Sequence, residues 1–326
     1  MLASADISSA NWIFFIGAIV FFLALDLGVF HRKAHEVSFK EALTWTSIWF
    51  AVAMVFGLVL APLMIEDWGR TETVEFVTGY IIELSLSMDN VFVIALIFVY
   101  FGVPRAFQHR VLFWGILGAL VMRGVMIVMG VALVQKFEWL FYVLGIFLVY
   151  TGVKMVFAEN EEVHPEKNLA IRLARKFLPV SPQFDGQRFF TTFGGQPALT
   201  PLALVLLMVE TTDLIFAVDS IPAILGITQN TYIVFTSNVF AILGLRSLYF
   251  VLAGAIAYFR HLKIGLSIVL VFIGLKMLLM NTEYHISTTV SLVVVGMIIG
   301  ISILASVAAA RRERARKPNH DSSSDE

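Results

Sequence analysis

The sequence contains no cysteine and few charged residues. None of its 326 residues is Cys, and Asp, Glu, Lys and Arg together make up only 14%. The absence of thiols excludes disulfides, iron–sulfur ligation, thiolate zinc sites and thiol redox chemistry on this chain. The scarcity of charge accompanies 59% hydrophobic residues and a mean hydropathy of +0.85, far above that of a water-soluble domain. The composition therefore indicates a membrane protein.

Apolar segments long enough to cross a bilayer recur along the chain, since about 20 apolar residues span the hydrocarbon core. The sequence predicts an all-α polytopic membrane protein with a single transmembrane domain over residues 1–310. Residues 311–326, first basic and then rich in Ser and Asp, are expected to form a disordered cytoplasmic tail. The nine expected spans are 12–30, 43–65, 74–101, 111–134, 139–157, 200–227, 232–258, 264–280 and 288–309.

Basic residues are concentrated on one side of these spans. The segments 31–42, 102–110, 158–199 and 259–263 and the tail from residue 310 hold 17 of the 23 Lys and Arg residues. The segments on the other side hold two, against seven acidic residues. The positive-inside rule then predicts that the N-terminus lies outside and the C-terminus in the cytoplasm, which agrees with an odd number of spans.

The longest segment outside the membrane, 158–199, is expected to be a cytoplasmic loop. Within it, residues 168–178 have one basic and one apolar face, which predicts a short helix at the membrane surface. Residues 188–200 predict a small hairpin with Gly194–Gly195 at its turn. We interpret both elements as parts of a structured linker.

Two acidic stretches of the sequence resemble each other. Residues 81–92 (IIELSLSMDNVF) align with 211–222 (TTDLIFAVDSIP), and shorter matching strings follow both in the same order. The third and sixth expected spans cross in opposite directions, so the sequence predicts an inverted repeat of three-helix units, at about 74–157 and 200–280. Inverted repeats that meet at polar sites near the midplane are typical of secondary transporters. Duplicated membrane bundles also arise without transport.

Five acids lie well inside the third and sixth spans: Glu83, Asp89, Glu210, Asp213 and Asp219. The alignment matches Glu83 with Asp213 and Asp89 with Asp219. Each ionisable group at a helix centre costs at least about 2.5–3.5 kcal/mol on insertion scales. Two arginines, Arg123 and Arg246, lie near the middle of spans, while lysines near span ends are expected to extend away to the interface. A surplus of about three negative charges remains, and it requires a cation or protons.

Other polar residues support this candidate site. Asn90 and Ser220 follow the two repeat aspartates, and Asp26 lies near the inner end of the first span. Six residues rotate by roughly 240° on a helix, so the two acids of each stretch would converge only at a local break. Pro222 is the candidate for that break in the second stretch, because proline removes a backbone hydrogen bond. We expect the two arginines to hold the acids in place or partly to replace the ion.

The available donors define the kind of ion. They are carboxylate, amide, hydroxyl and carbonyl oxygens, since thiols are absent and all seven histidines lie outside the spans. Such donors favour hard divalent cations such as Mg²⁺, Ca²⁺ or Mn²⁺, or protons that move along a carboxylate relay. No permanently bound cofactor is expected. The predicted metal ligands are Glu83, Asp89, Asn90, Glu210, Asp213 and Asp219.

Four strings of the sequence resemble the TerC family, and within it the Alx-like branch. They are VTGYIIELSLSMDNVFV (77–93), VETTDLIFAVDSIPAI (209–224), FTSNVFAILGLRSLYF (235–250) and LVFIGLKML (270–278). The resemblance runs from about residue 12 to 309 and implies a multi-pass protein of the bacterial inner membrane, linked by name to tellurium resistance. Alx-like members are associated with manganese efflux and alkaline pH, and have been labelled redox modulators. The family's acidic motif positions fall on the six predicted metal ligands.

Our leading hypothesis is a Mn²⁺ exporter in which the inverted units rock against each other, driven by proton exchange. One alternative is the handling of an oxyanion related to tellurium resistance, which would need positive charge where two arginines face five acids. Another is a non-transporting scaffold that docks partners on residues 158–199. An enzyme is not expected, because no GxSxG, HExxH or P-loop string occurs. The expected partners are Mn²⁺, protons and the lipid bilayer, without nucleic acid; the oligomeric state is left open.

Overall fold

The computed structural model of the chain describes residues 7–25, 38–157, 168–253, 262–280, 282 and 284–316. Apart from one short hairpin, its regular elements are helices. In chain order they are α1 (Ser9–Leu25), α2 (Phe39–Val55), the π-helical turn η2 (Phe56–Leu60), α3 (Ala61–Met64), α4 (Arg70–Tyr100), α5 (Arg105–Lys136), α6 (Trp139–Phe157), α7 (Leu169–Phe177), β1 (Phe190–Phe193), β2 (Gln196–Leu199), α8 (Pro201–Leu225), α9 (Thr231–Ala253), α10 (Leu262–Leu279) and α11 (Thr288–Arg316).

Eight stretches of helix among the described residues are long and apolar enough to cross a membrane. They correspond to eight of the nine expected spans and confirm an all-α polytopic membrane protein. The ninth, 12–30, corresponds to the apolar helix α1, and residues 26–37 after it lie outside the described part. At the other end, α11 continues to Arg316, so the first six residues of the tail expected to be disordered are helical; residues 317–326 lie outside the described part.

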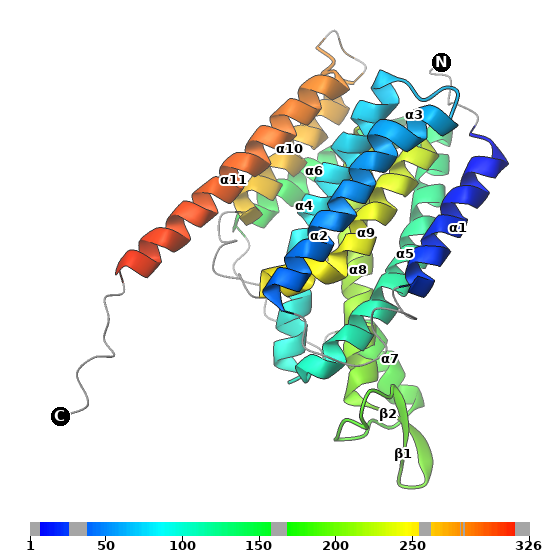
Figure 1. Cartoon of the computed structure of the whole chain (residues 1–326), viewed down its shortest axis with the longest axis vertical. Helices are drawn as coiled ribbons and strands as arrows, with labels where there is room; N and C mark the ends of the chain where they lie inside the picture. The colour runs from blue at the N-terminus through cyan, green and yellow to red at the C-terminus, as the bar shows by residue number, and fades with distance from the viewer. Residues whose placement is uncertain are drawn as a thin grey trace.

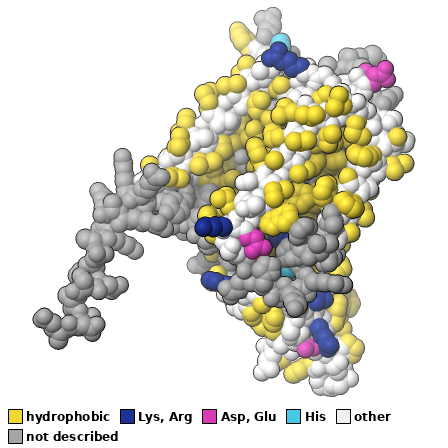
Figure 2. All heavy atoms as spheres, in the orientation of Figure 1, with side chains coloured by type: hydrophobic (Ala, Val, Ile, Leu, Met, Phe, Trp, Pro, Cys, Tyr) yellow, Lys and Arg dark blue, Asp and Glu magenta, His cyan; other side chains and the backbone are white. Residues whose placement is uncertain are grey.

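The long helices run side by side along one axis, while α7 and the β1–β2 hairpin lie at one end of the bundle (Figure 1). Hydrophobic side chains cover the middle of the face in Figure 2, and most coloured charged groups lie toward its two ends. Large apolar side chains such as Ile13 (72% exposed), Val121 (61%) and Leu304 (71%) point outward. A broad apolar surface of this kind is the one that lipid would cover.

Corresponding helices of the two repeats run in opposite directions. α5 and α8 are parallel neighbours, because Gly118 packs against Glu210 at one level and Gly130 against Ile221 at a later one. α4 runs opposite to α5, so α4 and its counterpart α8 are antiparallel (Figure 1). α6 and its counterpart α10 are antiparallel as well, with close contacts between Gly145 and Gly274 and between Gly152 and Ser267. These directions are those that an inverted repeat requires, and the repeat itself stays a prediction from the sequence.

The two repeats are nevertheless interleaved. α4 of the first repeat packs on α9 of the second, α5 packs on α8, and α6 packs on α10. Each close partnership therefore joins one helix from each repeat. The repeat units do not form the two separate blocks that the sequence hypothesis needed for a rocking motion. The packing instead defines a four-helix group, α4, α5, α8 and α9, and a helix pair, α6 and α10.

The α6–α10 pair is held together by direct backbone approach. The Ser267 hydroxyl donates a hydrogen bond of 2.6 Å to the carbonyl oxygen of Gly152. A Cβ atom added at Gly274 would lie 2.6 Å from the carbonyl oxygen of Gly145 and 2.9 Å from the backbone nitrogen of Val149. Small residues that allow such approach are typical of helix pairs in membranes, where packing rather than water exclusion drives association.

The segment before α8 forms the expected short helix and hairpin. Gly194 and Gly195 have φ values of +59° and +81°, a left-handed pair suited to the two-residue turn of a hairpin. The helix, α7, lies along the first half of α8 instead of lying apart from the bundle. Its N-cap residue Asn168 donates a hydrogen bond of 2.7 Å to Thr211 in the middle of α8, and shortly after α7 the chain pairs with Leu199, just before α8 begins.

The expected helix break at Pro222 is not formed, because α8 is helical as far as Leu225. Pro222 lies in the last turn of α8, where its own carbonyl still accepts a hydrogen bond from Gly226 (3.0 Å), so the loss of one N–H does not open the helix. The irregular helix turn is η2, in the second span. There the ring of Phe76 lies so close to Gly57 that an added Cβ would be 2.3 Å from it.

We expect Gly274→Ala to destabilise the protein by about 1–3 kcal/mol, because the new methyl group would overlap backbone atoms of α6 that cannot move aside. Gly300→Ala on α11 is the matched control, since an added Cβ there meets no described atom within 4 Å. Thermal unfolding in detergent should give a lower melting temperature for Gly274→Ala only. Equal melting temperatures for the two variants would contradict the close α6–α10 packing.

Candidate functional site

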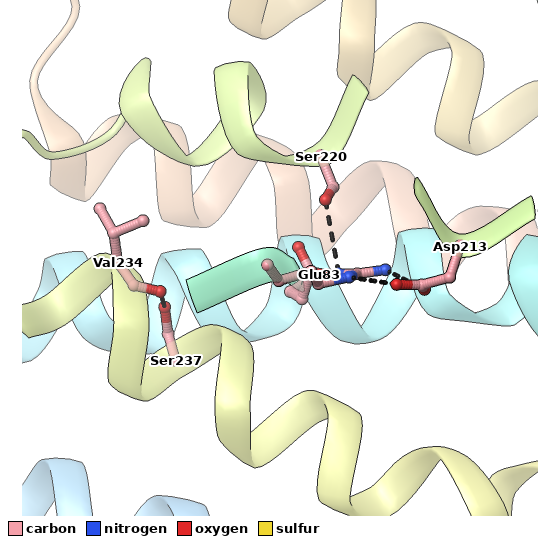
Figure 3. Close-up of polar contacts among 6 residues, drawn as sticks. Glu83, Asp213, Ser220, Val234 and Ser237 are labelled. Atoms are coloured by element: carbon pink, nitrogen blue, oxygen red, sulfur yellow. Dashed lines mark hydrogen bonds and ion pairs between the residues drawn. The ribbon is translucent and has the colours of Figure 1, made fainter. Parts of the chain in front are cut away.

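The centre of the candidate site is Arg123, which is only 1% exposed on α5. Its Nε and Nη2 donate hydrogen bonds to the two carboxylate oxygens of Asp213 on α8, at 3.1 and 2.7 Å. Its Nη1 contacts Glu83 on α4 and the hydroxyl of Ser220 on α8, the latter at 3.5 Å. Figure 3 shows Glu83, Asp213 and Ser220 converging from the two helices.

Asn90 on α4 supplies the last acceptor. In the amide orientation that satisfies both of its groups, its oxygen accepts from Arg123 Nη2 (3.0 Å) and its nitrogen donates to the carbonyl of Leu86 (3.1 Å). A guanidinium group has five N–H donors, and each donor of Arg123 now has an acceptor. The arginine is therefore saturated with hydrogen bonds inside the bundle.

The four acceptor residues around Arg123 form two repeat-equivalent pairs. Glu83 aligns with Asp213, and Asn90 aligns with Ser220, in the acidic stretches of α4 and α8. The inverted repeat thus presents its matched polar groups to a single arginine. One guanidinium cannot neutralise two carboxylates, so this cluster retains one negative charge. Glu83 is 0% exposed, and its Oε2 atom has no hydrogen-bond partner among the described residues.

Glu210 lies one turn before Asp213 on the same helix, half-buried against α5. A Cβ atom added at Gly118 would lie 2.0–2.4 Å from the carboxylate of Glu210, so this glycine makes the space that the carboxylate fills. The Oε2 atom of Glu210 is buried and has no hydrogen-bond partner among the described residues. Asp213 lies close enough to interact electrostatically with it. Glu210 therefore adds negative charge beside the Arg123 cluster.

The other predicted site residues lie in different surroundings. The carboxylate of Asp219 is half-buried, has Thr151 as a hydrogen-bond partner and lies near the charge of Lys154, both on α6. Asp89 is half-buried on α4, and Arg246 is half-buried on α9. Asp26 lies outside the described residues.

The six predicted metal ligands do not converge on one point. Within the described ranges, no three His, Asp or Glu side chains lie together in an arrangement that could hold a metal ion. The reason is the spacing noted in the sequence: Glu83 and Asp89 point in different directions on an unbroken α4, and so do Asp213 and Asp219 on α8. The structure brings together Glu83, Asn90 and Asp213, with Arg123 between them.

One lysine that the sequence hypothesis placed at the interface, Lys276, lies inside the bundle, whereas Lys154 is exposed on α6. Lys276 on α10 is only 7% exposed and lies near Glu75 on α4, which also has Thr228 as a hydrogen-bond partner. Lys154 lies close enough to Asp219 to interact with it electrostatically. The two lysines thus place positive charge near Asp219 and Glu75, which the expected surplus of about three negative charges did not count; that surplus stays a prediction. Glu75 was missed because it lies near the predicted end of its span.

Replacement of Arg123 tests the cluster. We expect Arg123→Met to destabilise the protein by about 3–5 kcal/mol, because it leaves Glu83 and Asp213 buried without a counter-charge. Arg188→Met is the matched control, since this arginine is 76% exposed and its nearest carboxylate, Asp185, lies 3.8 Å away. Surface replacements of that kind change stability by about 0.5 kcal/mol or less. Similar unfolding curves for both variants would show that Arg123 does not hold the helices together.

Comparison with known proteins agrees with this architecture. The sequence profile of the integral membrane protein TerC family matches residues 68–315. The chain is 50% identical over 304 residues to an uncharacterized membrane protein of Myxococcus xanthus, STKORF319, with 93% of this chain and 94% of the relative covered. It is 42% identical over 304 residues to a protein of Escherichia coli K12 named "Putative membrane-bound redox modulator Alx", with 92% and 94% covered. No solved structure matches. The chain is a member of the TerC family of integral membrane proteins.

Proposed function

We propose that this chain exports a divalent metal ion, Mn²⁺, from the cytoplasm across the bacterial inner membrane, in exchange for protons. The observation that carries the proposal is the shared arginine: Glu83 and Asp213, equivalent acids of two inverted repeats, are buried against one positive charge. The cluster is therefore negative before Glu210 is counted. Inside a bilayer such a surplus needs a mobile positive partner, and a substrate cation supplies it.

The donor chemistry supports a hard cation. The groups around the cluster are carboxylates, an amide and a hydroxyl, and the chain has no thiol. Carboxylate and carbonyl oxygens suit Mg²⁺, Ca²⁺ and Mn²⁺. The resemblance to Alx-like proteins favours Mn²⁺ among them. A chain without cysteine has no thiol of its own to oxidise, so a redox effect of the kind named for its relative would arise indirectly, through the supply of manganese.

The oxyanion alternative is disfavoured by the state of Arg123. An anion would need free N–H donors, yet all five donors of this guanidinium are committed to Asp213, Glu83, Ser220 and Asn90. Two of those partners are carboxylates, which would repel an anion. The same commitment suits a cation carrier, because the arginine holds the acids in place when the ion is absent.

Alternating access in this fold requires moving bodies other than the repeat units. The four-helix group carries the Arg123 cluster, while the α6–α10 pair is joined by glycine contacts and the bond from Ser267 to Gly152. Lys154 and Lys276 of the pair face Asp219 and Glu75 of the group. We therefore assign the exchange between inward and outward states to movement of the α6–α10 pair against the four-helix group.

Transport by purified protein in liposomes tests the proposal. We expect the wild type to move Mn²⁺ across the bilayer in a manner that depends on a pH gradient, and Glu83→Gln or Asp213→Asn to reduce the flux by about tenfold or more, because each removes the negative surplus. Asp185→Asn is the matched control: this aspartate lies in the loop before β1 and accepts a bond from Thr191. A wild type without Mn²⁺ flux would refute the proposal, as would amide variants with normal flux.

The same experiment distinguishes the scaffold alternative. A scaffold that docks partners on the loop before α8 would depend on α7 and the hairpin, and amide substitutions in α4 and α8 would leave its cellular role intact. Manganese tolerance of cells that carry Glu83→Gln should therefore fall with the flux measured in liposomes. Normal tolerance in these cells, combined with loss of tolerance on replacement of the exposed α7 residues Arg172 and Arg175, would favour the scaffold.

Gly118 provides a second probe. We expect Gly118→Ala to reduce Mn²⁺ flux, because its methyl group would take the space of the Glu210 carboxylate and force that flexible side chain to turn away. Stability should change little, since only the far end of one side chain must move. Gly244→Ala is the control, because Gly244 ends the string ILG (242–244) that matches ILG at 116–118, and an added Cβ there meets Trp49 at an ordinary 3.6 Å. Equal flux in the two variants would exclude Glu210 from the transport path.

A further inference from the structure

Three polar side chains on α4 and α9 are buried with atoms that have no hydrogen-bond partner among the described residues. They are Glu83 (Oε2), Ser87 (Oγ) and Asn238 (both the oxygen and the nitrogen of its amide). Their exposed fractions are 0%, 0% and 1%. A buried polar group without a partner costs free energy, about 1–3 kcal/mol, so each such group needs an explanation.

Their neighbours show that this is a local feature and not a general one. On α4, the hydroxyl of Ser85 donates a bond of 2.6 Å to the carbonyl of Ile81. On α9, the hydroxyl of Ser237, next to Asn238, donates a bond of 2.7 Å to the carbonyl of Ile233 (Figure 3 shows Ser237 with its second acceptor, Val234). The helices therefore satisfy their own serine hydroxyls at nearby positions, whereas Ser87 and Asn238 find no hydrogen-bond partner in the part of the chain that the structure describes.

The three side chains belong to two helices that pack on each other, α4 for Glu83 and Ser87 and α9 for Asn238. Glu83 and Ser87 are four residues apart, so they share one face of α4. α9 packs on α4, with Ser237 3.1 Å from where a Cβ of Gly79 would lie. Glu83 also contacts Arg123, which connects this face of α4 with α5.

Asn238 lies on the side of α9 that meets α5 at the level of Arg123. Three residues before it, Phe235 packs against Gly124, with 3.3 Å between the ring and an added Cβ. Four residues after it, Ile242 belongs to a buried cluster with Ile116 and Ala119. Residues at these spacings share a helix face, and Arg123 falls between Ala119 and Gly124 on α5.

We propose that Asn238 and Ser87, together with the Oε2 atom of Glu83, supply ligands to the cation, so that its site lies on the α4–α9 side of Arg123. This inference deepens the proposed function, on which it rests. A carboxylate, an amide oxygen and a hydroxyl are hard donors that suit Mn²⁺. The carboxylate of Glu83 then divides its two oxygens, with Oε1 bound to the arginine and Oε2 to the ion. Asn238 belongs to neither acidic stretch of the repeat, and spacing alone gives no sign of it.

Binding of Mn²⁺ to the purified full-length protein, followed by the loss of the electron paramagnetic resonance signal of free Mn²⁺, tests the inference. We expect Asn238→Leu and Ser87→Ala to weaken binding by about tenfold or more. Asn238→Asp should retain binding, because it keeps an oxygen donor. The matched controls are Ser237→Ala and Ser85→Ala, whose hydroxyls are already satisfied within their helices, and both should bind Mn²⁺ as the wild type does.

Thermal unfolding without metal separates a ligand from a structural group. Removal of an unsatisfied buried amide leaves stability unchanged or raises it. Asn238→Leu should therefore melt at or above the wild-type temperature in a chelator, and lose the increase that Mn²⁺ gives the wild type. A lower melting temperature in the chelator, with Mn²⁺ binding unchanged, would overturn the inference and make Asn238 a structural residue.

The outcome also distinguishes this inference from the proposed function. Mn²⁺ flux in the wild type, with binding and flux unchanged in Asn238→Leu and Ser87→Ala, would overturn the ligand assignment and leave the exporter standing. Binding of Ca²⁺ but not Mn²⁺, weakened by the same variants, would support the ligand assignment and refute manganese as the substrate. A wild type that binds neither ion would overturn the ligand assignment.

Discussion

The structure depends on one buried charge and the groups that neutralise it. Arg123 is only 1% exposed inside a bundle with a broad apolar surface, where a buried polar group without a hydrogen-bond partner is costly. Its contacts with Glu83 on α4 and Asp213 on α8 therefore determine how three helices from two repeats pack together. In the Arg123 cluster, α4 and α8 present matching acceptors twice, whereas the guanidinium of Arg123 is present once. This inequality leaves the Arg123 cluster with more carboxylates than positive charges, and the proposed cation transport follows from it.

The sequence predicted those features that depend on composition and on order along the chain. Bilayer thickness sets the length of an apolar span, so hydropathy located eight described spans. The direction of each span follows from counting, so the alignment of Glu83 with Asp213 was enough to predict inverted repeats. The hairpin turn at Gly194 and Gly195 was predictable because two successive left-handed residues favour glycine.

The sequence could not predict which helices become neighbours. α6 and α10 are both apolar, and their partnership depends on the close approach of Gly145, Gly152 and Gly274, which no spacing of hydrophobic residues reveals. Because helix neighbours could not be predicted, the buried position of Lys276 could not be predicted either. Whether Lys276 extends to the interface or turns inward depends on Glu75 lying beside it, 201 positions earlier in the chain. The prediction that the acids of each stretch meet at one site was wrong for a geometric reason. An unbroken helix keeps residues six positions apart on different faces.

Two features of the described residues limit where a cation can enter. All N–H donors of Arg123 have acceptors, and oxygens of Glu83, Ser87 and Asn238 have no hydrogen-bond partner. A cation that competed for the oxygens bound to the guanidinium would leave N–H donors unpaired in an apolar interior, which is unfavourable. Entry at the free oxygen of Glu83 avoids this conflict, because that carboxylate then bridges ion and arginine. Arg123 is in turn bound to Asp213 through both carboxylate oxygens. Occupation of the proposed site on α4 and α9 would thereby be transmitted to α8, so that one ion would act on helices of both predicted repeats.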